Sequence, residues 1–144
     1  MKMHMINLFA LMILSTGTVL AQDIPQSEVP EKVLRSFNEK FPKASDVEWE
    51  REGDLFQVDF DMGFFADHDA WFDASGTMTR HKEEISKSDL PAAVANAIAA
   101  QYAEYRIDDV DRITESGKVS YKVELERGEE DRNVYFSEDG TFIR

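Results

Sequence analysis

One amphipathic segment occurs twice in this 144-residue chain, and that duplication limits the possible folds more than any other feature. The stretch SEVPEKVLRSFNEKFP (residues 27–42) aligns without a gap on SDLPAAVANAIAAQYA (residues 88–103). Three apolar pairs match in this alignment: Val33 with Val94, Phe37 with Ile98 and Phe41 with Tyr102. Because a spacing of i, i+4, i+8 places side chains on one face of a helix, both segments are predicted to be amphipathic helices.

The start of each helix has its own signal. Each copy carries a serine, an acid and then a proline, as in Ser27 to Pro30 and Ser88 to Pro91. A serine hydroxyl can accept a hydrogen bond from a free N–H of the first turn, and a proline there loses no helical hydrogen bond. We therefore expect Ser27 and Ser88 to be the N-caps, with the prolines inside the first turns.

The similarity continues into segments with strand-like alternation. Residues 46–60 correspond to residues 109–125, and residues 70–80 (AWFDASGTMTR) correspond to residues 134–144 (VYFSEDGTFIR). Apolar side chains alternate with polar ones in both copies: Phe56, Val58 and Phe60 in the first, and Tyr121, Val123 and Leu125 in the second. Period-two alternation is typical of half-buried antiparallel strands.

The repeating unit is thus one helix followed by about three strands, and residues 81–87 (HKEEISK) form the joint between the copies. A helix on a three- or four-stranded sheet covers one face only, and such a unit is small for independent stability. We predict an α+β fold in which two α-β-β-β repeats (about residues 24–80 and 85–144) share one antiparallel sheet, with both helices on one face. Residues 22–144 form a single domain in this interpretation.

The N-terminal residues 1–21 are typical of a secretory signal peptide. A basic start at Lys2 precedes an apolar run that is too short for a bilayer core of ~30 Å, and Val19 and Ala21 suit cleavage before Gln22. We expect a periplasmic or secreted protein with no membrane span after cleavage; a retained anchor helix is the alternative. No cysteine follows the apolar run, which excludes a lipid anchor at the cleavage site.

Charge and cysteine content narrow the functional classes. Removal of residues 1–21 takes away one lysine and no acid, which leaves 15 basic and 29 acidic residues. This excess of negative charge disfavours nucleic acids and anionic lipids, and it favours a basic protein surface. The absence of cysteine excludes thiol catalysis, disulfides and cysteine-ligated zinc, so the chain depends on its apolar core for stability.

The second repeat carries a recognisable pattern: a helix with LPAAVANAI and a final tyrosine, then YKVEL, then VYFSEDGT. This pattern resembles the PepSY-like family of small exported bacterial proteins, whose tandem copies look like the fold of beta-lactamase-inhibitor protein. The resemblance covers about residues 24–144. It is carried mainly by core and turn positions: Leu90, Pro91, Val94, Ile98, Tyr102, Tyr121, Val123, Phe136, Asp139 and Gly140. It implies a fold and a general expectation of protein binding, and it implies no catalytic residue.

The most polar stretch, DFDMGFFADHDAWFD (residues 59–73), raises the question of a metal or catalytic centre. As a calcium loop it fails, because Gly63 stands where a ligand belongs and no glutamate closes the loop. His68 beside an acid could be a general base, but no nucleophile motif accompanies it, and the second repeat has Arg132 there. We expect Asp59 and Asp61 to face solvent, His68 and His81 to be exposed, and neither catalytic residues, nor a metal, nor a cofactor to be required.

The aromatic residues give the candidate binding site. If Phe72 and Phe136 face the helices, Trp71 and Tyr135 face the open side of the sheet. Phe64 and Phe65 replace Glu129 and Glu130 of the second repeat at a hairpin turn. Tryptophan and tyrosine often anchor protein interfaces. Phe64, Phe65, Trp71 and Tyr135 are therefore candidate protein-binding residues; the alternative is that one phenylalanine folds under the hairpin and long neighbouring side chains cover Trp71.

The leading functional hypothesis is an exported, non-enzymatic binding or inhibitory module whose partner is another exported or cell-envelope protein. The alternative is a periplasmic protein that binds a small ligand or a divalent cation through the acidic hairpin of residues 59–73. Catalysis involving His68 is the third hypothesis.

Overall fold

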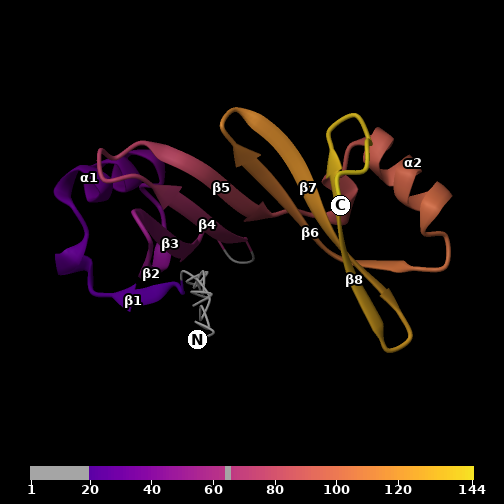
Figure 1. The fold of residues 1–144 in the computed structure, drawn as a ribbon, viewed down its shortest axis with the longest axis horizontal. Helices are drawn as coiled ribbons and strands as arrows, with labels where there is room; N and C mark the ends of the chain where they lie inside the picture. Colours follow the sequence, from indigo (N-terminus) through magenta and orange to yellow (C-terminus); the bar gives the residue numbers. More distant parts are fainter. Residues whose placement is uncertain (1–19, 64–65) are drawn as a thin grey trace, which may run out of the picture.

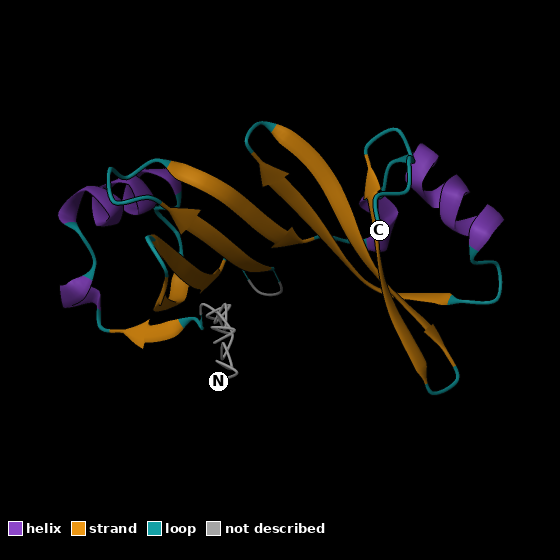
Figure 2. Cartoon of the chain, viewed as in Figure 1, coloured by secondary structure: helices purple, strands orange, loops and turns teal. Residues whose placement is uncertain are grey.

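The protein is one long antiparallel sheet with two helices, in a computed structural model that describes residues 20–63 and 66–144 (Figures 1 and 2). Eight strands follow one another across the sheet in chain order, and every neighbouring pair is antiparallel. The strands are β1 (Gln22–Ile24), β2 (Ser45–Glu52), β3 (Leu55–Asp61), β4 (Asp67–Phe72), β5 (Met78–Glu84), β6 (Arg106–Glu115), β7 (Lys118–Arg127) and β8 (Glu130–Ser137). The predicted α+β class is confirmed.

The two helices, α1 (Glu31–Lys40) and α2 (Ala92–Gln101), lie towards opposite ends of the molecule (Figure 1). Neither of them, nor any other helix within residues 20–63 and 66–144, has the length and apolar character needed to cross a membrane. Each helix follows a short 3-10 turn, Gln26–Glu28 before α1 and Lys87–Asp89 before α2. These paired turns are a detail in which the two repeats agree.

The predicted N-caps are wrong. Ser27 lies in the 3-10 turn before α1, and the cap residues of the two helices are Pro30 and Pro91. The reason lies in Val29 and Leu90, which are extended, with ψ of 130° and 134°. A residue before proline is disfavoured in the helical region, so neither helix can begin before its proline. Pro30 and Pro91 are themselves extended, with ψ of 140° and 141°, and each helix begins at the next residue.

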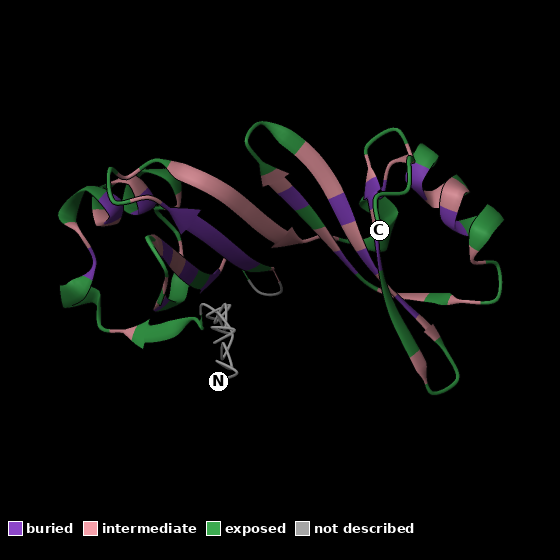
Figure 3. Cartoon of the chain, viewed as in Figure 1, coloured by how far each residue is buried: buried purple, intermediate pink, exposed green. Residues whose placement is uncertain are grey.

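Strand register sets which side chains face the helices. Phe56 pairs with Phe72, and Val58 pairs with Ala70, so these four side chains lie on one face of the sheet. They pack with Val33 and Phe37 of α1 in a first core, which Figure 3 shows as the buried segment on the left. A second core joins Val94 and Ile98 of α2 to the matching residues of the second repeat: Val110, Tyr121, Val123, Leu125, Val134 and Phe136. The predicted apolar faces of helices and strands are confirmed.

Both helices cover the same face. His68 of β4 pairs with Glu83 of β5, which pairs with Arg112 of β6, and Arg112 pairs with Tyr121 of β7. Paired residues on adjacent strands point to the same side of a sheet. Because Phe60, which pairs with His68, packs under α1 and Tyr121 packs under α2, the shared helix side predicted from the repeat is confirmed.

The charged segment expected as a joint is a strand. His81 to Glu84 belong to β5, which pairs with β4 on one side and with β6 on the other. Half-exposed along its whole length, β5 joins the two repeats through backbone hydrogen bonds, and its mixed charges hide its strand character in the sequence. The short strand β1, which pairs with β2, is also absent from the predicted repeat unit.

Two glycine turns connect the sheet to the helices. Gly76 and Gly140 have positive φ of 88° and 83°. A Cβ at Gly76 would lie 2.6 Å from the carbonyl oxygen of Lys32 in α1, and a Cβ at Gly140 would lie 2.5 Å from that of Ala93 in α2. Both a left-handed backbone and a close approach therefore require glycine at the same point of each repeat.

Candidate functional site

The open face of the sheet, opposite to the helices, carries Trp71 near the middle of the first repeat. Trp71 pairs with Gln57 on β3 and with Arg80 on β5. Its side chain is only 8% exposed, because the Arg80 guanidinium lies over the ring, 4.6 Å from the centroid. The indole Nε1 donates a hydrogen bond of 2.9 Å to Oε2 of Glu52. Trp71 thus faces the open side of the sheet, and the alternative in which long neighbouring side chains cover the ring is the one that the structure shows.

Tyr135 occupies the matching place in the second repeat. The guanidinium of Arg144 lies over its ring, 4.3 Å from the centroid, and the tyrosine is half-buried. Backbone hydrogen bonds join Tyr135 to Ile143 and Arg144, which hold the arginine beside the ring. Arg144 corresponds to Arg80 in the sequence repeat. The open face thus presents two aromatic side chains, each beneath an arginine, at equivalent positions of the two repeats.

Acidic side chains surround Trp71 on the open face. Asp59 is exposed, as expected, whereas Asp69 is 8% exposed and is held by Lys82 at 2.6 Å and by the amide of Gln57 at 3.1 Å. Partial burial, followed by the charges of Asp69 and Asp67, raises the pKa of the Asp59 carboxyl. Burial and nearby acids, first among them Asp23, also raise the pKa of Glu50. Crowded carboxylates give this face a negative field that favours a cationic partner.

The other two candidate residues for protein binding, Phe64 and Phe65, lie outside the described residues, as does the signal peptide up to residue 19. Gly63, with φ of 77°, comes just before them in the chain, and Gly128 has a φ of 62° at the corresponding turn between β7 and β8. Both glycines therefore have a left-handed backbone.

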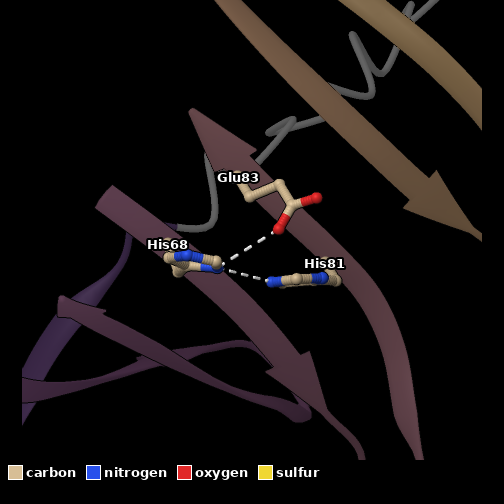
Figure 4. Close-up of side chains that lie close together, drawn as sticks. All are labelled: His68, His81 and Glu83. Carbon is tan, nitrogen blue, oxygen red and sulfur yellow. Dashed lines mark hydrogen bonds and ion pairs between the residues drawn. The ribbon is translucent and has the colours of Figure 1, made fainter. Parts of the chain in front are cut away.

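A second group of polar side chains lies on the helix-covered face, between the two cores. His68 of β4 and two residues of β5, His81 and Glu83, direct their polar atoms towards one another (Figure 4). His68 Nδ1 lies 2.9 Å from His81 Nε2 and 3.7 Å from Glu83 Oε2. Glu83 Oε1 also accepts a hydrogen bond from Arg112 of β6. The expected exposure of the histidines is wrong, since His68 is 7% exposed and His81 is half-buried.

Aromatic rings enclose this pair of histidines. Phe60 stacks on His68 with ring centroids 5.2 Å apart, and Phe41 lies 5.2 Å from His81. Burial lowers the pKa of His68 below its ordinary 6.5. Burial, and then the neighbouring His68 and Arg112, lower the pKa of His81 to about 4. Both imidazoles are therefore neutral at pH 7, and one donates its N–H to the other.

Chemically, the cluster offers two imidazole nitrogens and one carboxylate oxygen within 4.8 Å of one another. Two neutral imidazoles and a carboxylate are ligands that transition metals accept. The sequence did contain a signal for it. His68 is two residues before Ala70 and four before Phe72, so period-two alternation places all three on the buried face. The interpretation of the sequence does not predict this cluster, because it assigns His81 to the joint between the repeats and not to a strand beside His68.

The fold and the repeated site define a class of two-repeat, helix-on-sheet protein. The family described as “Putative beta-lactamase-inhibitor-like, PepSY-like” matches residues 18–65 and 54–144, and the chain belongs to this family. The second matched region begins at residue 54, within the first repeat, so the two regions overlap. A comparison with curated protein sequences finds no match.

Solved structures share this fold. A DUF2874 family protein from Bacteroides uniformis has a TM-score of 0.71 and 23% identity, over 80% of this chain and 86% of its own. A structure from Bacteroides eggerthii, titled as “putative periplasmic proteins”, has a TM-score of 0.73 and 19% identity, over 81% and 86%. A BLIP-like protein from Bacteroides fragilis has a TM-score of 0.67 and 24% identity, over 84% and 85%. At these identities the likeness shows the fold alone.

Proposed function

We propose that this protein is an exported, non-enzymatic module that binds another exported or cell-envelope protein on the open face of its sheet. One observation carries the proposal. The open face bears Trp71 and Tyr135 at equivalent positions of the two repeats, each under an arginine, while both helices lie on the other face. A large aromatic ring beneath a movable arginine can become the centre of an interface when the arginine turns to a partner.

The charge of the face selects the kind of partner. Exposed Asp59 lies near Glu50 and Asp69, and the raised pKa values of Asp59 and Glu50 reflect this crowding. A basic protein surface would relieve the repulsion, and the attraction would also speed association. Phe64 and Phe65, which lie between β3 and β4 in the sequence, are proposed as further apolar contacts.

Export is part of the same proposal. Residues 1–21 act as the signal peptide, with cleavage before Gln22, and the similarity to a structure titled as “putative periplasmic proteins” supports this destination. The BLIP-like structure from Bacteroides fragilis supports an inhibitory or regulatory role over a catalytic one. Fractionation of the native cells and N-terminal sequencing test the proposal, with Gln22 expected as the first residue of the exported protein.

The binding proposal is tested by affinity capture from the native cell envelope. Wild-type protein is expected to retain a partner that Tyr135→Ala and a Trp71→Ala, Phe64→Ala double variant lose. A matched pair of charge reversals separates the two faces. Asp59→Lys alters the open face, and Glu39→Lys alters an exposed residue of α1 on the helix side.

We expect Asp59→Lys to weaken capture and Glu39→Lys to leave it unchanged. Circular dichroism of every variant checks that the fold persists, because Trp71 is largely buried. If no captured protein depends on the open-face residues, or if Glu39→Lys weakens capture as much as Asp59→Lys, the proposal is wrong.

A further inference from the structure

The polar cluster on the helix-covered face does not belong to the proposed binding surface. His68 and His81 point to the opposite side of the sheet from Trp71, since Ala70 and Phe72 share their face. We propose that His68, His81 and Glu83 form a binding site for one late first-row divalent cation of the Zn²⁺ type.

The distances between the ligand atoms agree with such an ion. Zinc bound to nitrogen and oxygen at ~2.1 Å in a tetrahedron has its ligand atoms roughly 3.3 Å apart. His68 Nδ1 lies 2.9 Å from His81 Nε2, slightly closer than this, and 3.7 Å from Glu83 Oε2, slightly farther. Small side-chain rotations would turn the three atoms towards a shared centre, and the direct imidazole hydrogen bond would be replaced by two metal bonds.

Strand pairing brings the three ligand residues together before any metal binds. His68 pairs directly with Glu83 across β4 and β5, and His81 lies two residues before Glu83 on the same face of β5. All three thus come from adjacent positions of two central strands of an eight-stranded sheet. Sites built on regular strands keep their geometry better than sites built on loops.

Neighbouring side chains orient the ligands. Phe60 stacks on the His68 ring, and Phe41 packs beside the His81 ring, so neither imidazole can turn freely. Arg112 donates to Oε1 of Glu83, which leaves Oε2 directed towards His68. Outer contacts of this kind fix the orientation of metal ligands in known sites. Arg112 is also a nearby cation that opposes a metal, and the carboxylates of Asp67 and Asp69 offset its charge at His68.

The chemistry of the donors selects the class of ion. Two imidazole nitrogens with one carboxylate suit Zn²⁺ and its neighbours, whereas Mg²⁺ and Ca²⁺ prefer oxygen ligands only. The side chains of His68 and Glu83 are 9% and 16% exposed, so a fourth ligand would be a water molecule that enters through this small exposed surface.

The repeat supplies an internal comparison. The residue that corresponds to His68 in the second repeat is Arg132, which pairs with Leu125 as His68 pairs with Phe60. An arginine cannot ligate a metal. The inference therefore predicts one ion per chain, bound by the first repeat.

The test is a titration of the purified, metal-stripped protein with Co²⁺ and then Zn²⁺. We expect one equivalent of Co²⁺ to give the strong visible absorption of a four-coordinate site, and Zn²⁺ to displace it. Zn²⁺ should also raise the melting temperature, because an ion that binds only the folded state stabilises it, whereas Mg²⁺ should have no such effect. Absence of the cobalt absorption in wild-type protein overturns the proposal.

Variants then assign the ligands. His81→Gln and Glu83→Gln should each weaken Zn²⁺ binding by more than the roughly tenfold to hundredfold that loss of an outer partner costs. An Asp59→Asn, Asp61→Asn double variant serves as the control for the acidic hairpin and should bind Zn²⁺ as wild type does. Binding that survives His81→Gln, or that is lost only in the hairpin control, also overturns the proposal.

A spectroscopic readout on wild-type protein covers the case in which a ligand variant does not fold. The imidazole NMR signals of two histidines should shift together on addition of one equivalent of Zn²⁺. Unshifted imidazole signals contradict the site. The result is independent of the proposed partner, since His81→Gln should still permit capture through the open face.

Discussion

The hairpin of β3 and β4 and the hairpin of β7 and β8 occupy equivalent places in the two repeats, yet their ends contain different groups. In the first, His68 is buried against His81 beneath aromatic rings. In the second, exposed Arg132 lies at the corresponding position, with its guanidinium 5.7 Å from the ring centroid of Tyr105. The same backbone therefore carries a neutral, enclosed cluster in one repeat and a charged, exposed one in the other.

The neighbouring strand explains the difference. In the first repeat β5 runs beside β4 and brings His81 and Glu83 over to His68. In the second, the segment beside β8 pairs at Phe142 and reaches Tyr135, and on the side of Arg132 away from β7 no described strand follows. Arg132 instead contacts Glu130 at 3.0 Å, as does Arg127 at 2.8 Å, and the Tyr105 hydroxyl donates to the same carboxylate at 2.8 Å. A third strand thus converts a surface position into an enclosed one.

The largest effects should come from the two cores, where the repeats are most alike. Phe72 and Phe136 are both 0% exposed and correspond in the repeat. Each Phe→Ala variant should lower the free energy of unfolding by about 3–5 kcal/mol, through lost burial and a new cavity. Urea denaturation measures this loss in the free energy of unfolding. A loss below ~1 kcal/mol at one site would show that its core contributes little, and two separate transitions would show that β5 and β6 do not couple the repeats.

The next effect concerns the turns that touch the helices. Gly76→Ala and Gly140→Ala should each cost about 2–3 kcal/mol, because positive φ strains alanine and its Cβ meets a helix carbonyl. Gly117→Ala is the matched control, since its φ is 75° but no atom lies within 4 Å of the added Cβ. It should cost only about 1 kcal/mol. Thermal denaturation measures these losses of stability. If Gly76→Ala and Gly117→Ala lose the same stability, the contact with the helix does not contribute to the cost.

The histidine cluster of the first repeat and the Glu130 cluster of the second should change the free energy of unfolding in different pH ranges. The unfolded chain protonates His81 near pH 6.5, whereas the folded protein resists protonation down to about pH 4. Because the unfolded state then binds more protons, the free energy of unfolding should fall as pH falls through this range and change little above it. His81→Gln should flatten the slope there. The measurement is urea denaturation at several pH values with a chelator present.

Glu130 provides the comparison from the second repeat. The Tyr105 hydroxyl and then Arg127 lower its pKa to about 2 from an ordinary 4.5. Its folded pKa is depressed, so its stabilisation is present above pH 4.5 and is lost as pH falls towards 2. Glu130→Gln should therefore lower the free energy of unfolding by a constant amount above about pH 4.5 and change its slope against pH only below that. A changed slope of the free energy of unfolding between pH 4.5 and 6.5 in Glu130→Gln would contradict the separation of the two ranges.

The parts of the fold that could be predicted are those that depend on local periodicity. Val33 and Phe37 in the helix, and Phe56 and Val58 in the strand, show their buried faces directly in the alternation of residue types. The helix starts could not be derived from the serines, since a proline three residues later keeps the residue before it extended and delays the helix. The strand β5 was hidden because its half-buried side chains are mostly charged and show no apolar alternation.

The candidate sites were harder because they depend on contacts between strands. That Trp71 faces away from the helices follows from Phe72, but its coverage by Arg80 and Glu52 requires the register of three strands. Likewise, His68 and His81 are thirteen residues apart, and only the pairing of β4 with β5 brings them together. Sequence patterns give the face of a side chain more readily than its neighbours across the sheet.

The smallest effect should come from the arginines that cover the open-face aromatics. Arg80→Ala and Arg144→Ala should each lower the free energy of unfolding by about 0.5–1 kcal/mol, as expected for a cation–π contact near the surface. Arg80→Ala should also expose Trp71 and increase quenching of its fluorescence, with Trp49 replaced by phenylalanine to isolate the signal. Arg144→Ala should leave that quenching unchanged. Equal quenching with and without Arg80 would mean that other side chains cover Trp71, and the comparison between the two arginine-covered rings would then fail.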